Sequence, residues 1–156
     1  MNLRRAVSKD IPDVLYLLSQ VLEVHAKIRP DLFIPQTTKY GKDELEEMFL
    51  DDSRPVYVAT DDDDRTIGYA MCQIEEPKFS STMVYRKIMF IDDLCVDENA
   101  RGSHVGRKLF EHVKSEAKRL GCYEVTLNVW EGNDAALAFY NAMGMKTKET
   151  QMELIL

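Results

Sequence analysis

The segment that most constrains the fold is a strand, a glycine-containing turn and a helix between residues 88 and 120. Residues Ile88–Val96 are mainly β-branched, aromatic and aliphatic, and turn-forming residues follow them, so we expect a buried strand that ends there. From Val105 onward, apolar residues recur at intervals of three and four with charged residues between them. This spacing predicts an amphipathic helix, and Gly121 supplies its C-terminal stop signal.

The turn between this strand and helix has the composition of an anion site. The first N–H groups of a helix lack intrahelical partners and lie at the positive end of its dipole, which suits a phosphate or pyrophosphate. Gly102 and Gly106 let a ligand approach the backbone, and Arg101 and Arg107 add positive charge. The turn therefore predicts a nucleotide-like cofactor, although many turns with two glycines bind nothing.

Two named pyrophosphate motifs are excluded. A Walker loop needs G-x-x-x-x-G-K-[ST], and the spacing of Gly102 and Gly106 is wrong for it. A dinucleotide fingerprint needs G-x-G-x-x-G directly after the first strand of a βαβ unit, and this is also absent. The order of strand, turn and helix is thus more informative than the glycines.

That order resembles the acyl-CoA-binding motif of the GNAT superfamily of N-acetyltransferases, in which a strand ending in an apolar triplet precedes R/Q-x-x-G-x-G/A and a helix. A second family signature, N-x-x-A-x-x-F-Y-x-x-x-G-F, resembles residues 133–145, with Met145 in place of the usual aromatic residue. One departure is His104, which stands where the family usually has its first glycine. This change is severe only if the backbone there needs a positive φ.

The resemblance implies a single N-acetyltransferase domain, residues 1–156, of the α/β class (α+β type). In the GNAT fold a mixed, mainly antiparallel central sheet of six to seven strands is flanked by about four helices, with a V-shaped splay at the central strands. The sequence pattern predicts helices over residues 11–27, 42–50, 105–120 and 135–143, and strands over 3–7, 56–60, 66–74, 88–96, 124–129 and 146–156.

The resemblance also implies where acetyl-CoA binds. Its pantetheine arm would pair with the backbone of the central strand at Leu94, Cys95 and Val96. Asn133 matches an asparagine that contacts CoA, and it is also a natural N-cap for the helix that follows. The cofactor-binding residues implied for the turn are Arg101, Gly102, Ser103, His104, Val105, Gly106 and Arg107.

The implied chemistry is direct attack of a neutral amine on a thioester. Tyr140 matches the tyrosine near the CoA sulfur and is predicted to contact the cofactor and act as general acid; the alternative is simple packing beside Phe139. Consecutive residues of a strand face opposite sides, so only one of Asp92 and Asp93 is expected to face the cleft. Counting back from Val96, the family's usual acidic position is Asp92, which would act as base through a water relay.

Residues between the first two predicted helices form a loop that carries Phe33 and Tyr40. The resemblance implies that this loop helps to line the acceptor side, and an ordinary connecting loop is an equal alternative. His25, near the end of the first predicted helix, is assigned no role. The four aspartates at 61–64 are interpreted as a solvated hairpin tip, because the chain lacks an EF-hand spacing.

Composition limits the classes of partner that the chain is expected to bind. The formal net charge of −7 and the absence of a basic stripe argue against nucleic acid and favour a cationic or amine-bearing substrate. No apolar run approaches the length of a membrane span, so we expect a cytoplasmic protein without a membrane partner. The three cysteines show no metal-ligand spacing, and no metal is expected; a nucleophilic Cys95 would need a histidine partner.

The hypothesis is therefore an acetyl-CoA-dependent N-acetyltransferase that acts in a ternary complex. The acceptor is a primary amine of a small molecule, a peptide N-terminus or a lysine, and the sequence does not decide among these. The alternative is an inactive CoA-binding regulatory module with the same fold. The apolar last strand, Met152–Leu156, also predicts a possible homodimer.

Overall fold

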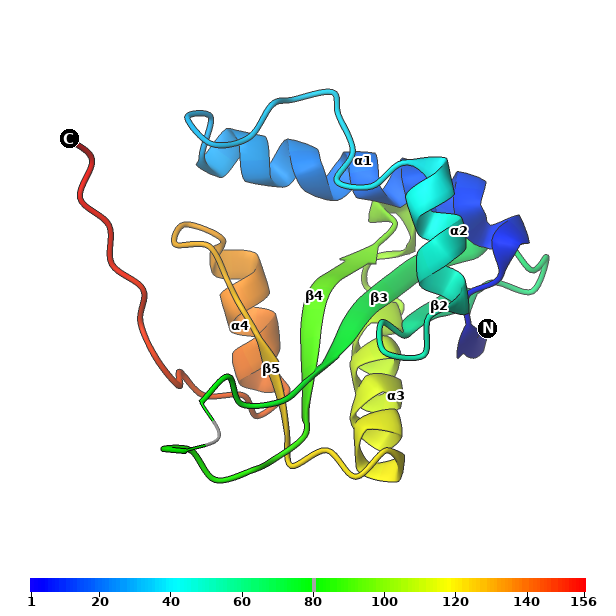
Figure 1. The fold of residues 1–156 in the computed structure, drawn as a ribbon. Helices are drawn as coiled ribbons and strands as arrows, with labels where there is room; N and C mark the ends of the chain where they lie inside the picture. The colour runs from blue at the N-terminus through cyan, green and yellow to red at the C-terminus, as the bar shows by residue number, and fades with distance from the viewer. Residues whose placement is uncertain (80) are drawn as a thin grey trace.

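The computed structural model describes residues 1–79 and 81–156 and arranges them as one sheet with helices on both faces (Figure 1). The strands lie in the order of the chain, with β1–β2, β2–β3 and β3–β4 antiparallel and β4–β5 parallel. The mixed, mainly antiparallel sheet and the four α-helices match the prediction. The strands are β1 (Asn2–Arg5), β2 (Val56–Thr60), β3 (Thr66–Glu75), β4 (Ile88–Val96) and β5 (Glu124–Leu127), and the helices are α1 (Ile11–Ile28), α2 (Lys42–Leu50), α3 (Val105–Arg119) and α4 (Asp134–Ala142).

The prediction of six to seven strands is wrong for the described residues, which form a sheet of five. Residues 146–156 form no strand, and the chain leaves the body as an extended segment (Figure 1). A strand needs a partner for its backbone groups, and in the described residues this segment makes no ladder with β5. Two ion pairs tether it: Lys148 contacts Glu124 at 2.7 Å, and Glu153 contacts Arg29 at 2.6 Å.

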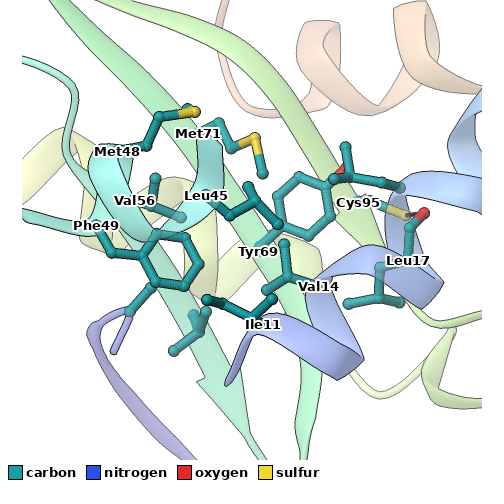
Figure 2. Close-up of a cluster of buried hydrophobic side chains, with 13 residues drawn as sticks. Ile11, Val14, Leu17, Leu45, Met48, Phe49, Val56, Tyr69, Met71 and Cys95 are labelled. Carbon is teal, nitrogen blue, oxygen red and sulfur yellow. Dashed lines mark hydrogen bonds between the residues drawn. The ribbon is translucent and has the colours of Figure 1, made fainter. Parts of the chain in front are cut away.

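Two apolar cores cover the two faces of the sheet. The first lies beneath α1 and α2, where Val14, Leu17 and Leu45 are fully buried against β3 (Figure 2). The second lies beneath α3, where Leu109 and Val113 pack on the opposite face. Full burial of one such side chain contributes about 1.5–3 kcal/mol, so these cores hold α1 and α3 firmly on the sheet.

The pairing of β4 changes along its length. On one side it pairs with β3, with an irregularity at Met71 and Cys72 that leaves Asp92 without a register partner. On the other side it pairs with β5 only from Ile88 to Ile91. The chain after β5 then diverges from β4 toward α4 (Figure 1). The structure thus has the predicted splay beside the C-terminal half of β4.

Candidate active site

The C-terminal half of β4 presents one free backbone edge. Leu94, Cys95 and Val96 are in register with β3. Beyond Ile91, the opposite edge has no strand partner among the described residues. Unpaired backbone donors and acceptors in a row can pair with an extended ligand as with another strand. The three residues predicted to hold a pantetheine arm therefore lie at a suitable open edge.

The turn after β4 leads into the N-terminus of α3. Gly102 has a φ of 82°, and His104, the N-cap residue, has a φ of 62°. The condition that makes a non-glycine residue costly at position 104 is therefore met. Left-handed backbone costs an ordinary L-residue about 1–2 kcal/mol, although histidine is among the residues that tolerate it better.

The N-terminus of α3 is open to a ligand. His104 makes no side-chain capping bond, and the N–H groups of Val105, Gly106 and Arg107 have no acceptor in the described part of the chain. The first turn carries no acidic residue. The exposed Arg101 and Arg107 form no ion pair with the described residues. Free N–H groups, the helix dipole and two arginines together suit an anionic group.

Gly106 stands between the end of β4 and α4. A Cβ atom on this residue would lie 3.5 Å from Val96 on one side and 3.5 Å from Phe139 on the other. These are ordinary contact distances, so the packing alone does not require glycine.

The helix α4 positions Asn133 and Tyr140. Asn133 is its N-cap, as predicted, and its side-chain oxygen accepts a hydrogen bond from the Ala136 N–H at 3.2 Å. The ring of Tyr140 packs against Phe110 and Phe139, with centroids 6.2 and 5.1 Å away. Burial, with a smaller contribution from nearby negative charge, raises the pKa of Tyr140 above its ordinary value. The phenol therefore stays protonated at neutral pH.

Asp92 and Asp93 lie on the same face of β4, so the prediction that they face opposite sides is wrong. Ile91 and Leu94 both pack into the core beneath α3, although alternation would separate residues three apart. The bulge at Asp92 inserts one extra residue and resets the alternation. As a result both carboxylates project toward the side of α1 and α2, where their hydrogen-bond partners lie.

Asp92 is held by the loop between α1 and α2. Its two carboxylate oxygens accept hydrogen bonds from Lys39 Nζ at 2.7 and 2.8 Å. The hydroxyl of Tyr40 donates to the same carboxylate at 2.9 Å, and burial together with this carboxylate raises the pKa of Tyr40. The loop therefore covers the acidic face of β4, consistent with a lining role. Sequence reasoning missed Lys39, because no local pattern places it beside β4.

Asp93 is the second acidic residue, to which the sequence assigned no role. It accepts a hydrogen bond from the hydroxyl of Tyr69 at 2.6 Å. Burial raises the pKa of Asp93 to about 6, against the opposing effect of that hydrogen bond and of Lys39. A carboxyl group with a pKa in this range can exchange protons near neutral pH, which makes it relevant to acid–base chemistry.

An aromatic cluster joins the α1–α2 loop to the segment after β5. The Phe33 ring lies 5.2 Å from the His25 ring and 5.4 Å from the Trp130 ring. The Arg29 guanidinium lies 6.0 Å from the Trp130 centroid. Because burial and Lys39 both lower the pKa of His25, this ring favours its neutral form. The cluster bridges the two sides of the splay. Sequence reasoning missed it, and the one tryptophan of the chain, which follows a predicted strand, was the feature that could have indicated it.

The cysteines do not form a nucleophilic site. The Cys95 thiol is buried and points at the Leu17 carbonyl, 3.5 Å away (Figure 2). Burial raises the pKa of Cys95 to about 12, which keeps the thiol protonated. Among the residues that the structure describes, no group of three or more histidine, cysteine and acidic side chains could hold a metal ion, and no helix could cross a membrane.

Comparison with known proteins places this geometry in context. Residues 21–145 match the acetyltransferase (GNAT) family. The chain is 34% identical over 90 residues to a glucosamine 6-phosphate N-acetyltransferase of Trypanosoma brucei brucei, covering 58% of this chain and 57% of that protein. It is 32% identical over 106 residues to the peptidyl-lysine N-acetyltransferase YjaB of Escherichia coli, covering 66% of this chain and 58% of that protein.

A solved structure resembles the whole chain more closely. A variant of the BH1408 protein from Bacillus halodurans superposes with a TM-score of 0.94 at 33% identity, covering 100% of this chain and 99% of that one. By contrast, the matches span less than two thirds of the length of the two acetyltransferases. The similarity to the solved structure therefore supports the same fold over the whole chain.

Proposed function

The chain belongs to the acetyltransferase (GNAT) family, and from this premise we propose that it is an acetyl-CoA-dependent N-acetyltransferase that acetylates a primary amine. The observation that carries the proposal is the free edge of β4 next to the open N-terminus of α3. One extended ligand with an anionic end satisfies both features, and acetyl-CoA is such a ligand.

The residues of the splay suit the separate parts of acetyl-CoA. The backbone of Leu94, Cys95 and Val96 pairs with the pantetheine amides. The free N–H groups at the start of α3 take the pyrophosphate, with Arg101 and Arg107 beside it. Here Ser103 and His104 contribute through the backbone of the turn, and Asn133 adds a polar contact from the start of α4.

The acid–base chemistry is assigned to two side chains. Asp92 removes a proton from the acceptor ammonium, and the free amine attacks the thioester carbonyl directly in a ternary complex. As the carbon–sulfur bond breaks, Tyr140 donates its phenol proton to the departing sulfur. The support for these roles is the position of Asp92 at the start of the splay and the protonated, partly buried phenol of Tyr140.

The acceptor is a cationic primary amine such as a lysine side chain. Two adjacent carboxylates, Asp92 and Asp93, lie on the face covered by the α1–α2 loop, and Asp92 already binds an ammonium group there. This agrees with the peptidyl-lysine activity in the name of the E. coli relative. A sugar phosphate, the acceptor named for the T. brucei relative, would bring its negative charge toward these carboxylates.

The test combines calorimetry and turnover. Acetyl-CoA titrated into the protein is expected to bind with micromolar affinity, whereas ATP and NAD are not, because they lack the pantetheine arm. Thiol release is then followed with a lysine peptide and with glucosamine 6-phosphate. Acetyl-CoA binding without turnover on any amine would favour the alternative, a CoA-binding regulatory module, and absence of binding would reject both.

We also propose that the chain forms a homodimer through its C-terminal segment, residues 146–156. Met152, Leu154 and Ile155 are 89%, 84% and 74% exposed in the single chain. The outer edge of β5 is unpaired in the described residues, so it offers hydrogen-bond partners for such a segment. A second copy can supply the segment and bury this apolar surface.

A further inference from the structure

Lys39 occupies the position in which an acceptor amine would meet the proposed base. Its ammonium contacts both oxygens of Asp92, at 2.7 and 2.8 Å. Asp92 directly follows Ile91, the last residue of β4 that pairs with β5. The ammonium of Lys39 is therefore held by the first β4 side chain beyond the start of the splay, where the proposed acetyl-CoA edge begins.

This contact differs from the other ion pairs in the described chain. Lys39–Asp92 is the ion pair that reaches β4, whereas Lys9, Lys114 and Lys148 pair with acidic residues elsewhere. The side chain of Lys39 is 46% exposed, and that of Asp92 is 15% exposed. An ammonium that is half exposed keeps the freedom to turn on its four-carbon stem.

The loop holds Lys39 in place. The neighbouring Tyr40 donates to the same carboxylate, and its ring centroid lies 5.4 Å from Lys39 Nζ. Further back, the Gln36 N–H donates to the Glu23 side chain at 2.7 Å, which fastens the loop to α1. Contacts at two points of the loop, Gln36 and Tyr40, thus position this one lysine over β4.

We propose that Lys39 is a self-acetylation site, at which the chain acetylates its own lysine with acetyl-CoA. The proposal rests on the proposed acetyltransferase function. Asp92 takes one proton from the Lys39 ammonium, and the neutral Nζ then attacks the thioester carbon. As the amide bond forms and the carbon–sulfur bond breaks, the nitrogen releases its second proton to solvent, and Tyr140 protonates the sulfur, which leaves as CoA thiol. Tyr140 then regains a proton from solvent. Acetyl-CoA and the lysine are the only reactants, and no oxidant or reductant takes part.

The intramolecular arrangement gives Lys39 an advantage over other lysines. A nucleophile held beside the reacting group behaves as if present at a very high local concentration, and the entropy cost is already met by the fold. Lys42 is the natural comparison, because it is exposed and lies three residues away at the start of α2. We expect Lys39 to be acetylated at least about tenfold faster than Lys42.

The experiment incubates the purified chain with acetyl-CoA and maps the modified lysines by mass spectrometry over time. The chain should gain one acetyl group at Lys39, by a process whose rate does not depend on protein concentration. The Lys39→Arg variant should lose this modification, while Lys42→Arg should keep it. In Asp92→Asn, Lys39 should be modified no faster than Lys42.

A mixing experiment separates reaction within a chain from reaction between chains. Lys39→Arg protein is mixed with Asp92→Asn protein, which retains Lys39 but lacks the proposed base. Faster acetylation of Lys39 in the Asp92→Asn chain when the Lys39→Arg protein is present than when it is absent would overturn the intramolecular proposal. Equal rates at Lys39 and Lys42 would also overturn it, because uncatalysed acetylation of exposed lysines would then account for the result.

The readouts distinguish this proposal from the function on which it rests. Thiol release with an external lysine peptide is measured on the same samples. External turnover without modification of Lys39 rejects self-acetylation and leaves the acetyltransferase function standing. If acetyl-CoA binds but neither external turnover nor modification of Lys39 is observed, the acetyltransferase function itself is rejected.

Discussion

Asp92 and Asp93 are consecutive residues of β4, and both carboxylates point to the side of α1 and α2. The bulge in β4 produces this arrangement, since it breaks the alternation between Ile91 and Leu94. Two carboxyl groups side by side experience different surroundings: Asp92 meets an ammonium, and Asp93 meets a tyrosine hydroxyl. Burial raises the pKa of Asp93, and the first prediction depends on this shift.

Replacing Asp93 with asparagine should stabilise the protein at neutral pH. The pKa of Asp93 is raised to about 6, so the folded chain holds this proton more tightly than the unfolded chain, where the value is about 3.9. Stability is then lost as pH rises from about 4 to 6. The amide of an asparagine does not ionise, and we expect a gain of roughly 1–3 kcal/mol at pH 7 that shrinks toward pH 4.

Urea unfolding at several pH values measures this effect. The matched control is Asp92→Asn, which removes the neighbouring carboxylate and its ion pair with Lys39. This control should show no comparable gain that grows with pH. A gain for Asp93→Asn that is the same at pH 4 and pH 7 would contradict the assigned pKa.

His104 offers a test of the left-handed backbone at the start of α3. Position 104 has a φ of 62°, so glycine there should make the folded protein more stable, because glycine lacks the Cβ that causes the strain. Relative to His104→Ala, we expect His104→Gly to be more stable by about 1 kcal/mol in chemical denaturation. Calorimetry should find acetyl-CoA affinity retained in His104→Gly, since the N–H groups, not the imidazole, are proposed to bind.

Loss of acetyl-CoA binding in a folded His104→Gly protein would instead mean that the imidazole takes part in binding. Equal stability of the alanine and glycine variants would show that the backbone at position 104 does not adopt the left-handed conformation. The two measurements are independent, because one reports the backbone and the other reports the ligand contacts.

Tyr140→Phe tests the proposed general acid. The hydroxyl has no hydrogen-bond partner among the described residues, so its removal should leave stability nearly unchanged. Loss of a general acid lowers kcat by roughly a hundredfold or more, while the affinity for acetyl-CoA stays about the same. Tyr123→Phe is the control, because Tyr123 is 78% exposed and should keep full turnover. A kcat for Tyr140→Phe equal to that of the control would exclude the role.

Local patterns predicted the central elements well. The bounds of β4 and the start of α3 at Val105 match the predictions, because hydrophobic spacing and turn residues report burial within a single segment. The turn near His104 and the cap at Asn133 were recognisable for the same reason. These features depend on residues close together in the sequence.

The remaining features depend on pairing between distant segments. The bulge at Asp92 arises from the register between β3 and β4, and neither strand alone reveals it. The contact of Lys39 joins the α1–α2 loop to β4, and the contact of Trp130 joins the segment after β5 to the same loop. The predicted final strand failed because strand formation requires a partner edge, and the apolar composition of residues 146–156 says nothing about where that edge lies.

That missing partner gives the last prediction, on the oligomeric state. If the C-terminal segment pairs with a second copy, light scattering after gel filtration should give twice the 18.0 kDa of one chain. Leu154→Lys should shift the mass to that of one chain, because a charge replaces an apolar side chain whose burial contributes about 1.5–3 kcal/mol. Gln151→Lys adds the same charge at an exposed polar position of the segment and should remain dimeric. A single-chain mass for the unmodified protein would reject the dimer, and a dimer that survives Leu154→Lys would place the interface outside the C-terminal segment.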